Sequence, residues 1–198
     1  MEKYEVFIKK HIKLNKAELV TFRLRNTLLK FEKGDIIREV ESVHDTMYFL
    51  ESGLVRSYFL NENGKDTSWH FYFNTPDSHE TNLFVVDFDS FIHLTKSQLY
   101  FEALEPCKIY AIKKSDIELM HTATKKWLRF SLKMSESAYS FVHHKYLMQV
   151  AQEAQQRYNW LVETMPYLNE MVPQYHIASY LGITPQHLSR LKKASEHM

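Results

Sequence analysis

The residues best suited to bind a charged partner lie near the C-terminus of the chain. Between Thr184 and Lys193 the sequence reads TPQHLSRLKK, which holds three basic side chains and no acidic one. Arginine and glutamine form paired hydrogen bonds with guanine and adenine edges, and lysine pairs with phosphate groups. The segment therefore predicts contact with double-stranded DNA through seven side chains, namely Thr184, Gln186, His187, Ser189, Arg190, Lys192 and Lys193.

The residues around this segment predict two short helices joined by a tight turn. Ala178 is small enough for two helices to cross closely, and Gly182 allows the left-handed backbone that such a turn needs. Thr184 suits the N-cap of the second helix and Pro185 its first position. This pattern is typical of a DNA-binding helix-turn-helix; the alternative is an ordinary helical hairpin with a solvated basic face. The apolar positions that would hold the helices together are Ile177, Leu181, Ile183, Leu188 and Leu191.

No other set of residues has the spacing of a catalytic or metal site. The sequence holds eleven histidines, but none has the close spacing that ligands on one strand or one helix need. The single cysteine, Cys107, excludes an internal disulfide, a four-cysteine zinc site and a cysteine-ligated iron–sulfur cluster. A cupin-like β-barrel enzyme would need a cluster of His and Glu ligands on its strands, and the sequence shows no such cluster. We therefore expect no metal, no cofactor and no enzyme activity.

The first half of the chain predicts an antiparallel β structure. Three of the four glycines, Gly34, Gly53 and Gly64, fall in the first third of the chain at intervals that suit turns between strands. The segment Asn61–Gly64 favours a hairpin turn, and its flanks are rich in β-branched and aromatic residues. We expect strands over about residues 27–112, preceded by one or two short helices around 4–25.

After the strands, the apolar residues follow a helical period. Ser115 and Glu118 match a capping box, and a long helix is expected from about 125 to 147. Its apolar seam either packs on the core of its own chain or forms a two-stranded parallel dimer, and Ser137 and Lys145 lie within it. Further helices are expected over 151–163 and in two compact segments at the end. The predicted dimer contacts are Trp127, Phe130, Met134 and Phe141.

Composition bounds the remaining possibilities. The 198 residues are 44% hydrophobic and 25% charged, which is ordinary for a globular protein. The net charge is +1, so binding to nucleic acid must come from a local patch. The N-terminus is charged throughout, and no apolar run approaches the length of a membrane span. We expect a cytoplasmic protein without a membrane partner.

These elements together predict an α+β chain in three parts. Residues 1–115 form an antiparallel β-roll, a double-stranded β-helix of jelly-roll type, and residues 116–148 form a long dimerisation helix. Residues 149–198 form a helix-turn-helix domain. The chain resembles the Crp/Fnr superfamily of bacterial transcription regulators. The residues that carry this resemblance are Phe31–Asp35, Tyr48–Arg56, Asn63–Lys65 and Ile177–Arg190.

The resemblance implies a homodimeric regulator that binds a near-palindromic DNA operator, contacts RNA polymerase and senses a small-molecule effector in its β-roll. Many Fnr-like members carry the pattern E-x-x-S-R on the helix that reads the bases. Here Ser189 and Arg190 match that pattern, but Gln186 replaces the Glu, which puts the usual half-site in doubt. The alternative is a ligand-binding or protein-binding module of the same kind that does not bind DNA.

The effector implied by the resemblance is not cAMP. Members that bind cyclic nucleotides carry a Gly-Glu pair and, some ten residues later, an Arg that holds the phosphate. Here Glu80 has no Gly before it and Ser97 stands where the Arg is expected. Five acids between 66 and 95 (Asp66, Asp77, Glu80, Asp87 and Asp89) also disfavour an anionic ligand. The candidate effector pocket comprises Arg56, Glu80, Lys96, Ser97 and Trp127.

Overall fold

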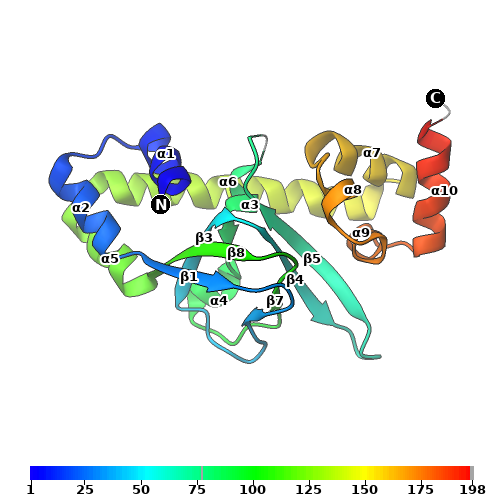
Figure 1. The fold of residues 1–198 in the computed structure, drawn as a ribbon, viewed down its shortest axis with the longest axis horizontal. Coiled ribbons are helices and arrows are strands. Elements are labelled where there is room, and N and C mark those ends of the chain that lie inside the picture. The colour runs from blue at the N-terminus through cyan, green and yellow to red at the C-terminus, as the bar shows by residue number, and fades with distance from the viewer. Residues whose placement is uncertain (77, 197–198) are drawn as a thin grey trace. The chain divides into compact units, whose positions relative to one another are not determined.

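The computed structural model describes residues 1–76 and 78–196, with the side chains of 195 and 196 excepted, so Asp77 lies outside the described residues. The chain divides into two compact units. The first comprises Met1–Arg56 and Phe71–Tyr139, and the second comprises Ser57–His70 and the residues from Ser140 onward. Figure 1 shows the elements of both units.

Unit 1 begins with two short helices, as the sequence predicts. Helix α1 spans Glu2–His11 and α2 spans Lys16–Leu24. Helix α2 has a capping box, in which the Asn15 side chain accepts a hydrogen bond from the Glu18 backbone and the Glu18 carboxylate accepts one from the Asn15 backbone. This reciprocal cap fixes the start of α2.

The strands form two four-stranded sheets within the described chain, which confirms the predicted β-roll. Sheet A has the order β1-β8-β3-β6 and sheet B the order β2-β7-β4-β5. In sheet A, β8 is antiparallel to both β1 and β3. The strands of sheet A are β1 Thr27–Phe31, β3 Thr46–Ser52, β6 Phe84–Val85 and β8 Cys107–Lys113. Those of sheet B are β2 Ile36–Arg38, β4 Leu54–Leu60, β5 Asp66–Phe73 and β7 Tyr100–Ala103.

The two faces of sheet A carry different clusters because side chains alternate along a strand. Tyr48 and Leu50 of β3 join a buried cluster that includes Phe101 of sheet B, so this cluster fills the space between the sheets. Phe49, which lies between them in the sequence, joins a second cluster with Tyr4 of α1. Helices therefore cover one face of sheet A, and sheet B covers the other.

The turn between β3 and β4 requires glycine. Gly53 has a φ of +102°, and a Cβ atom there would lie 2.6 Å from both Cys107 Sγ and the Pro106 carbonyl oxygen. Cys107 is itself buried, and burial raises the pKa of its thiol to about 11. Backbone conformation and close packing thus exclude any larger residue at position 53.

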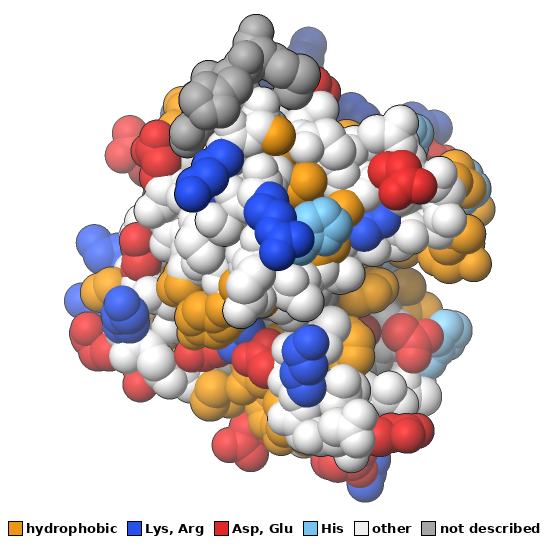
Figure 2. Space-filling view, turned by 90° about the vertical axis from the view of Figure 1, so that its right-hand side faces the viewer, with side chains coloured by type: hydrophobic (Ala, Val, Ile, Leu, Met, Phe, Trp, Pro, Cys, Tyr) orange, Lys and Arg blue, Asp and Glu red, His pale blue; other side chains and the backbone are white. Residues whose placement is uncertain are grey.

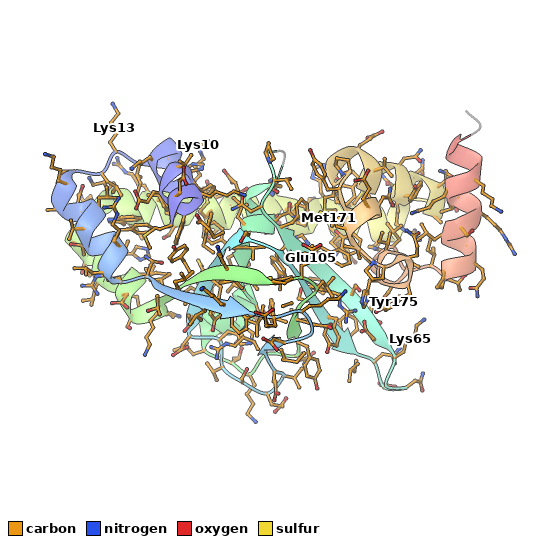
Figure 3. All side chains as sticks on the ribbon, in the orientation of Figure 1. Lys10, Lys13, Lys65, Glu105, Met171 and Tyr175 are labelled. Carbon is orange, nitrogen blue, oxygen red and sulfur yellow. The ribbon has the colours of Figure 1, made fainter. Side chains whose placement is uncertain are left out.

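The predicted hairpin at Asn61–Gly64 is present between β4 and β5. The Asn61 side chain accepts hydrogen bonds from the backbones of Asn63 and Lys65, each at 3.0 Å, and Gly64 has a φ of +71°. Figure 3 labels Lys65 at the tip of this hairpin. The local sequence was sufficient to predict this turn.

Three helices connect the remaining elements of unit 1, and one predicted cap is wrong. Helix α3 spans Glu80–Leu83, α4 spans Phe88–His93 and α5 spans Lys114–Ala123. The N-cap of α5 is Lys113, with no side-chain cap hydrogen bond, and not Ser115. The helix begins directly after β8, so Ser115 lies inside the first turn and cannot cap it.

The long helix is confirmed as α6, Lys125–Ala151. Unit 2 continues with α7 Ala154–Thr164, α8 Leu168–Met171, α9 Gln174–Tyr180 and α10 Pro185–Glu196. Within the described ranges, none of the helices combines the length and apolar character needed to cross a membrane.

Candidate nucleic-acid interface

Helices α9 and α10 form the predicted pair, joined by a turn at Gly182. Gly182 has a φ of +68°, and the following Ile183 backbone donates a hydrogen bond to the Ala178 carbonyl at 2.9 Å. Ile177, Ala178 and Leu188 have no exposed surface, so the close helix crossing expected at Ala178 is present. This packing gives α10 a fixed orientation relative to α9.

The start of α10 also follows the prediction. Pro185 is its first residue, and the Thr184 hydroxyl accepts a hydrogen bond from the His187 backbone at 3.2 Å. Proline has no N–H to leave unsatisfied at that position, and the threonine satisfies one of the free backbone donors of the first turn. Thr184 therefore acts as a structural cap, and its hydroxyl is already engaged by the backbone.

Two side chains outside the motif hold the end of α9. Gln149 of α6 donates a hydrogen bond to the Tyr180 carbonyl at 3.1 Å, and Arg157 of α7 donates one to the Leu181 carbonyl at 3.0 Å. These carbonyls lie at the helix C-terminus, where intrahelical partners are missing. Neither positioning residue can be recognised from the motif, because both lie outside it.

The exposed side of α10 is polar and basic. Gln186, Ser189 and Arg190 are exposed and lie three and four residues apart, which places them on one helical face. His187 and Lys193 are also exposed, whereas Lys192 is half-buried. Figure 2 shows basic side chains and a histidine close together on one face, and Figure 3 shows nitrogen-tipped side chains that extend from α10 away from α9. The face thus presents hydrogen-bond donors and positive charge to solvent.

A buried lysine lies behind this helix pair. The Lys145 ammonium of α6 lies 4.3 Å from the ring centroids of both Trp69 and Tyr180, and it donates a hydrogen bond to the Trp69 carbonyl. Burial lowers the pKa of Lys145 to about 7, while the two ring faces favour its charged form. Sequence reasoning placed Lys145 on an apolar seam but had no signal for these partners.

The hairpin strand also contacts α9. The Ser179 hydroxyl accepts a hydrogen bond from the Ser68 backbone at 2.9 Å and donates one to the Asp66 carbonyl at 3.3 Å. Strand β5 therefore uses its own backbone groups to hold the first helix of the motif. The result is that α9 is fixed from three elements of unit 2: β5, α6 and α7.

The structure separates the five residues of the candidate effector pocket. Glu80 and Trp127 line one cavity of unit 1, and the other three are not among its lining residues. Arg56 is buried and pairs with Glu102 at 2.7 Å. Lys96 pairs with Glu41 at 2.9 Å on the surface, and the Ser97 hydroxyl donates to the Asp87 carboxylate at 2.6 Å.

Over the described residues, no three His, Cys, Asp or Glu side chains form a group that could hold a metal ion.

Comparison with solved structures finds the same architecture over most of the chain. FixK2 from Bradyrhizobium japonicum matches with a TM-score of 0.71 and 17% identity, over 87% of this chain and 85% of that one. A transcriptional regulator described as of the Crp/Fnr family, from Eubacterium rectale, matches with a TM-score of 0.65 and 15% identity, over 92% and 84%. The chain has the Crp/Fnr fold. The global regulator CLP of Xanthomonas campestris, described as responsive to c-di-GMP, matches with a TM-score of 0.65 and 12% identity, over 92% of each chain.

Comparison with protein-family models and with curated protein sequences finds no match. The Crp/Fnr fold of this chain is therefore evident from its structure, at sequence identities too low to carry residue roles across.

Within this Crp/Fnr fold, the side chains predicted to form a dimer seam turn toward their own chain. Trp127 is only 6% exposed and stacks on Phe22 of α2, with ring centroids 5.8 Å apart. Phe130 and Met134 pack against the same cluster of unit 1. In unit 2, Phe141 lies half-buried near His70, with ring centroids 5.0 Å apart. The first of the two interpretations of the seam, packing on the core of its own chain, describes these contacts.

A second apolar stripe on α6 is exposed. Its residues recur at steps of four, seven, three and four, which places them on one helical face. Leu132 is 58% exposed and Tyr146 is 65% exposed. The residues with these steps are Leu128, Leu132, Tyr139, Val142 and Tyr146, and Val150, four residues further on and 68% exposed, continues the stripe.

Proposed function

We propose that this protein is a sequence-specific DNA-binding transcription regulator that acts as a homodimer in the cytoplasm and has no enzyme activity. The observation that carries the proposal is the exposed polar face of α10, held on a rigid helix pair. The Crp/Fnr fold supports it, because the comparison proteins include one described as a transcriptional regulator and one described as a global regulator.

In the proposed complex, α10 enters the major groove of DNA. Arg190 donates two hydrogen bonds to a guanine and Gln186 bonds to an adenine, since both residues lie on the exposed face. Ser189 contacts either base or backbone, and Lys193 pairs with phosphate. Thr184 keeps its role as N-cap, so its contribution is to fix the helix and not to read a base.

The proposed dimer uses the exposed stripe of α6 and not the four residues predicted from the sequence. Leu132 and Tyr146 belong to a regularly spaced apolar face that a second copy would cover, whereas Trp127 is already buried in its own unit. A parallel two-fold pair would place two α10 helices about one turn of DNA apart. The operator is therefore expected to be a near-palindrome.

Unit 1, the proposed sensor, is proposed not to bind cAMP or cGMP tightly. Ser97 occupies the position where a phosphate-binding Arg is expected, and its hydroxyl bonds to the carboxylate of Asp87. A carboxylate at that place repels a cyclic phosphate. Contact with RNA polymerase stays a prediction from the family resemblance.

The test selects the fragments of random DNA that the protein binds. It then measures the affinity of two variants for the selected operator and for random DNA. Arg190→Ala is expected to cost about 1–3 kcal/mol of binding free energy and to relax discrimination at one base pair of each half-site. Lys193→Ala is the matched control on the same helix. It should weaken operator and random DNA alike and reduce the dependence of binding on salt.

Two outcomes would contradict the proposal. If the parent protein does not slow the migration of any DNA fragment through a gel at low salt, the chain is a module of this fold that does not bind DNA. If Arg190→Ala keeps the parent's ratio of operator to random-DNA affinity, Arg190 does not read a base.

A further inference from the structure

Unit 1 contains a cavity of about 220 Å³, partly open to solvent, between the helical face of sheet A and helices α1, α2, α3, α4, α5 and α6. Protein interiors hold few voids larger than a water molecule, so a cavity of this volume is not ordinary packing. It lies outside the space between the two sheets, which the Leu50 and Phe101 cluster occupies. The cavity is therefore a separate feature of the fold.

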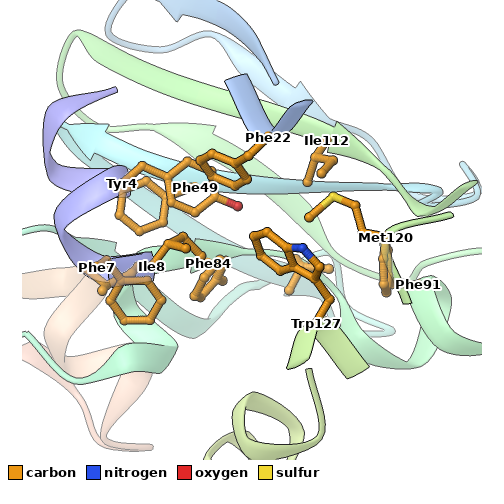
Figure 4. Close-up of a cluster of buried hydrophobic side chains, with 12 residues drawn as sticks. Tyr4, Phe7, Ile8, Phe22, Phe49, Phe84, Phe91, Ile112, Met120 and Trp127 are labelled. Atoms are coloured by element: carbon orange, nitrogen blue, oxygen red, sulfur yellow. The ribbon is translucent and has the colours of Figure 1, made fainter. Parts of the chain in front are cut away.

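The wall of the cavity is almost entirely apolar. Figure 4 shows Trp127, Met120 and Ile112 facing Tyr4 and Phe84 across this cluster. An apolar space of this kind is poorly hydrated, because water there finds few hydrogen-bond partners. An apolar molecule would recover the dispersion contacts that the wall atoms lack.

A few polar groups interrupt this wall. His121 Nε2 lies 2.7 Å from the Ser131 hydroxyl, and both residues line the cavity. Burial lowers the pKa of His121, so its ring is neutral near pH 7 and can exchange hydrogen bonds with a small polar group. Glu80 also lines the cavity, and its carboxylate lies 3.4 Å from the His11 ring.

The charge of the lining excludes an anion. Among the described residues that line the cavity there is no lysine or arginine, whereas the Glu80 carboxylate is present. A phosphate, sulfonate or carboxylate would lose its hydration without gaining a positively charged partner, and it would face the Glu80 carboxylate. The ligand class that fits is neutral.

We propose that this cavity is a binding site for a neutral aromatic or branched apolar molecule with one hydroxyl or carbonyl group. A cavity of roughly 150 Å³ is known to bind benzene, so 220 Å³ suits a ring system of about ten heavy atoms. The polar group of the ligand bonds to His121 and Ser131, and the rings lie against Trp127. The site does not depend on DNA binding, and the two proposals are tested separately.

The experiment titrates the full chain with naphthol and, as a matched probe, with naphthalene sulfonate. Naphthol is expected to bind saturably with a dissociation constant of about 10 µM, and the sulfonate at least tenfold more weakly because it is an anion of the same ring size. No DNA is present, so failure here is distinct from failure of the proposed regulator function.

Methionine methyl signals in an NMR spectrum locate the bound probe. Three methionines line the cavity, and three others lie in the described part of unit 2, which gives an internal control. The signals expected to move are those of Met47, Met120 and Met134. The signals expected to stay are those of Met148, Met165 and Met171.

A variant then fills the cavity. Ala138 lines it, so Ala138→Phe should raise the dissociation constant of naphthol about tenfold or more, while Ala151→Phe, at an exposed position of the same helix, should not. Absence of saturable naphthol binding, equal affinity for the sulfonate, or shifts confined to the unit 2 methionines would each overturn the proposal. If Ala138→Phe does not fold, the methyl shifts of the parent chain decide the question.

Discussion

The two apolar faces of α6 lie one residue apart in the sequence and have different environments in the fold. The inner face, which includes Trp127, Phe130, Met134 and Phe141, packs against its own chain, and Trp127 stacks on Phe22 of α2. The outer face is the exposed stripe that begins at Leu128, the neighbour of Trp127. The same contrast holds in unit 2, where Lys145 is buried and Tyr146 is exposed. Apolar character along a helix therefore does not say which face the chain itself covers. The elements that pack against the helix decide this.

The largest expected effect comes from removing a large buried side chain of the inner face. Trp127→Ala should lower the free energy of unfolding by about 3–5 kcal/mol, because it removes a large buried ring and leaves its partners without contact. Arg129→Ala, at an exposed position of the same turn, should change it by less than about 0.5 kcal/mol. Chemical denaturation measures both. Equal losses for the two variants would mean that the inner face is not part of the core.

The next effect concerns the outer face. Leu132→Asp should raise the dissociation constant of the dimer at least ~100-fold, because each copy would bury an unpaired charge. His144→Asp introduces the same charge at an exposed position outside the stripe and should leave the dimer intact. Sedimentation velocity at micromolar concentration checks the pair. A Leu132→Asp dimer as tight as the parent would place the interface elsewhere.

The smallest expected effect concerns the protonation of Lys145, which lies on the inner face of α6 in unit 2. Between pH 7 and the ordinary lysine value of 10.5, the unfolded chain holds a proton at Lys145 that the folded chain releases. The free energy of unfolding should therefore rise with pH, by about 2 kcal/mol from pH 7 to pH 9 relative to Lys145→Met. Denaturation of both proteins across that range gives the difference. A flat difference would show that the two aromatic rings keep Lys145 charged in the fold.

The parts of the fold that the sequence predicted well depend on local chemistry. The turn at Gly182 and the start of α10 follow from a glycine with positive φ and a threonine followed by proline. The hairpin at Asn61 follows from hydrogen bonds within five residues. Such features need no knowledge of distant parts of the chain.

The features that sequence reasoning missed depend on residues far apart in the chain. Lys145 is buried by Trp69 and Tyr180, and the inner face of α6 is covered by helices from the N-terminus. The spacing of apolar residues on α6 fits either face, so only those distant partners identify the exposed one. The cavity was unpredictable for the same reason, since its lining comes from helices and strands throughout unit 1.

The close contact between Gly53 and Cys107 has a practical consequence for chemical labelling. Cys107 is the single cysteine of the chain, its side chain is buried, and its raised pKa keeps the thiol protonated at neutral pH. Thiolate is the form that reacts with maleimides and oxidants, so the folded protein should resist both. A cysteine introduced at Lys193 would then carry the only reactive thiol, and a fluorophore attached there would report on α10 alone.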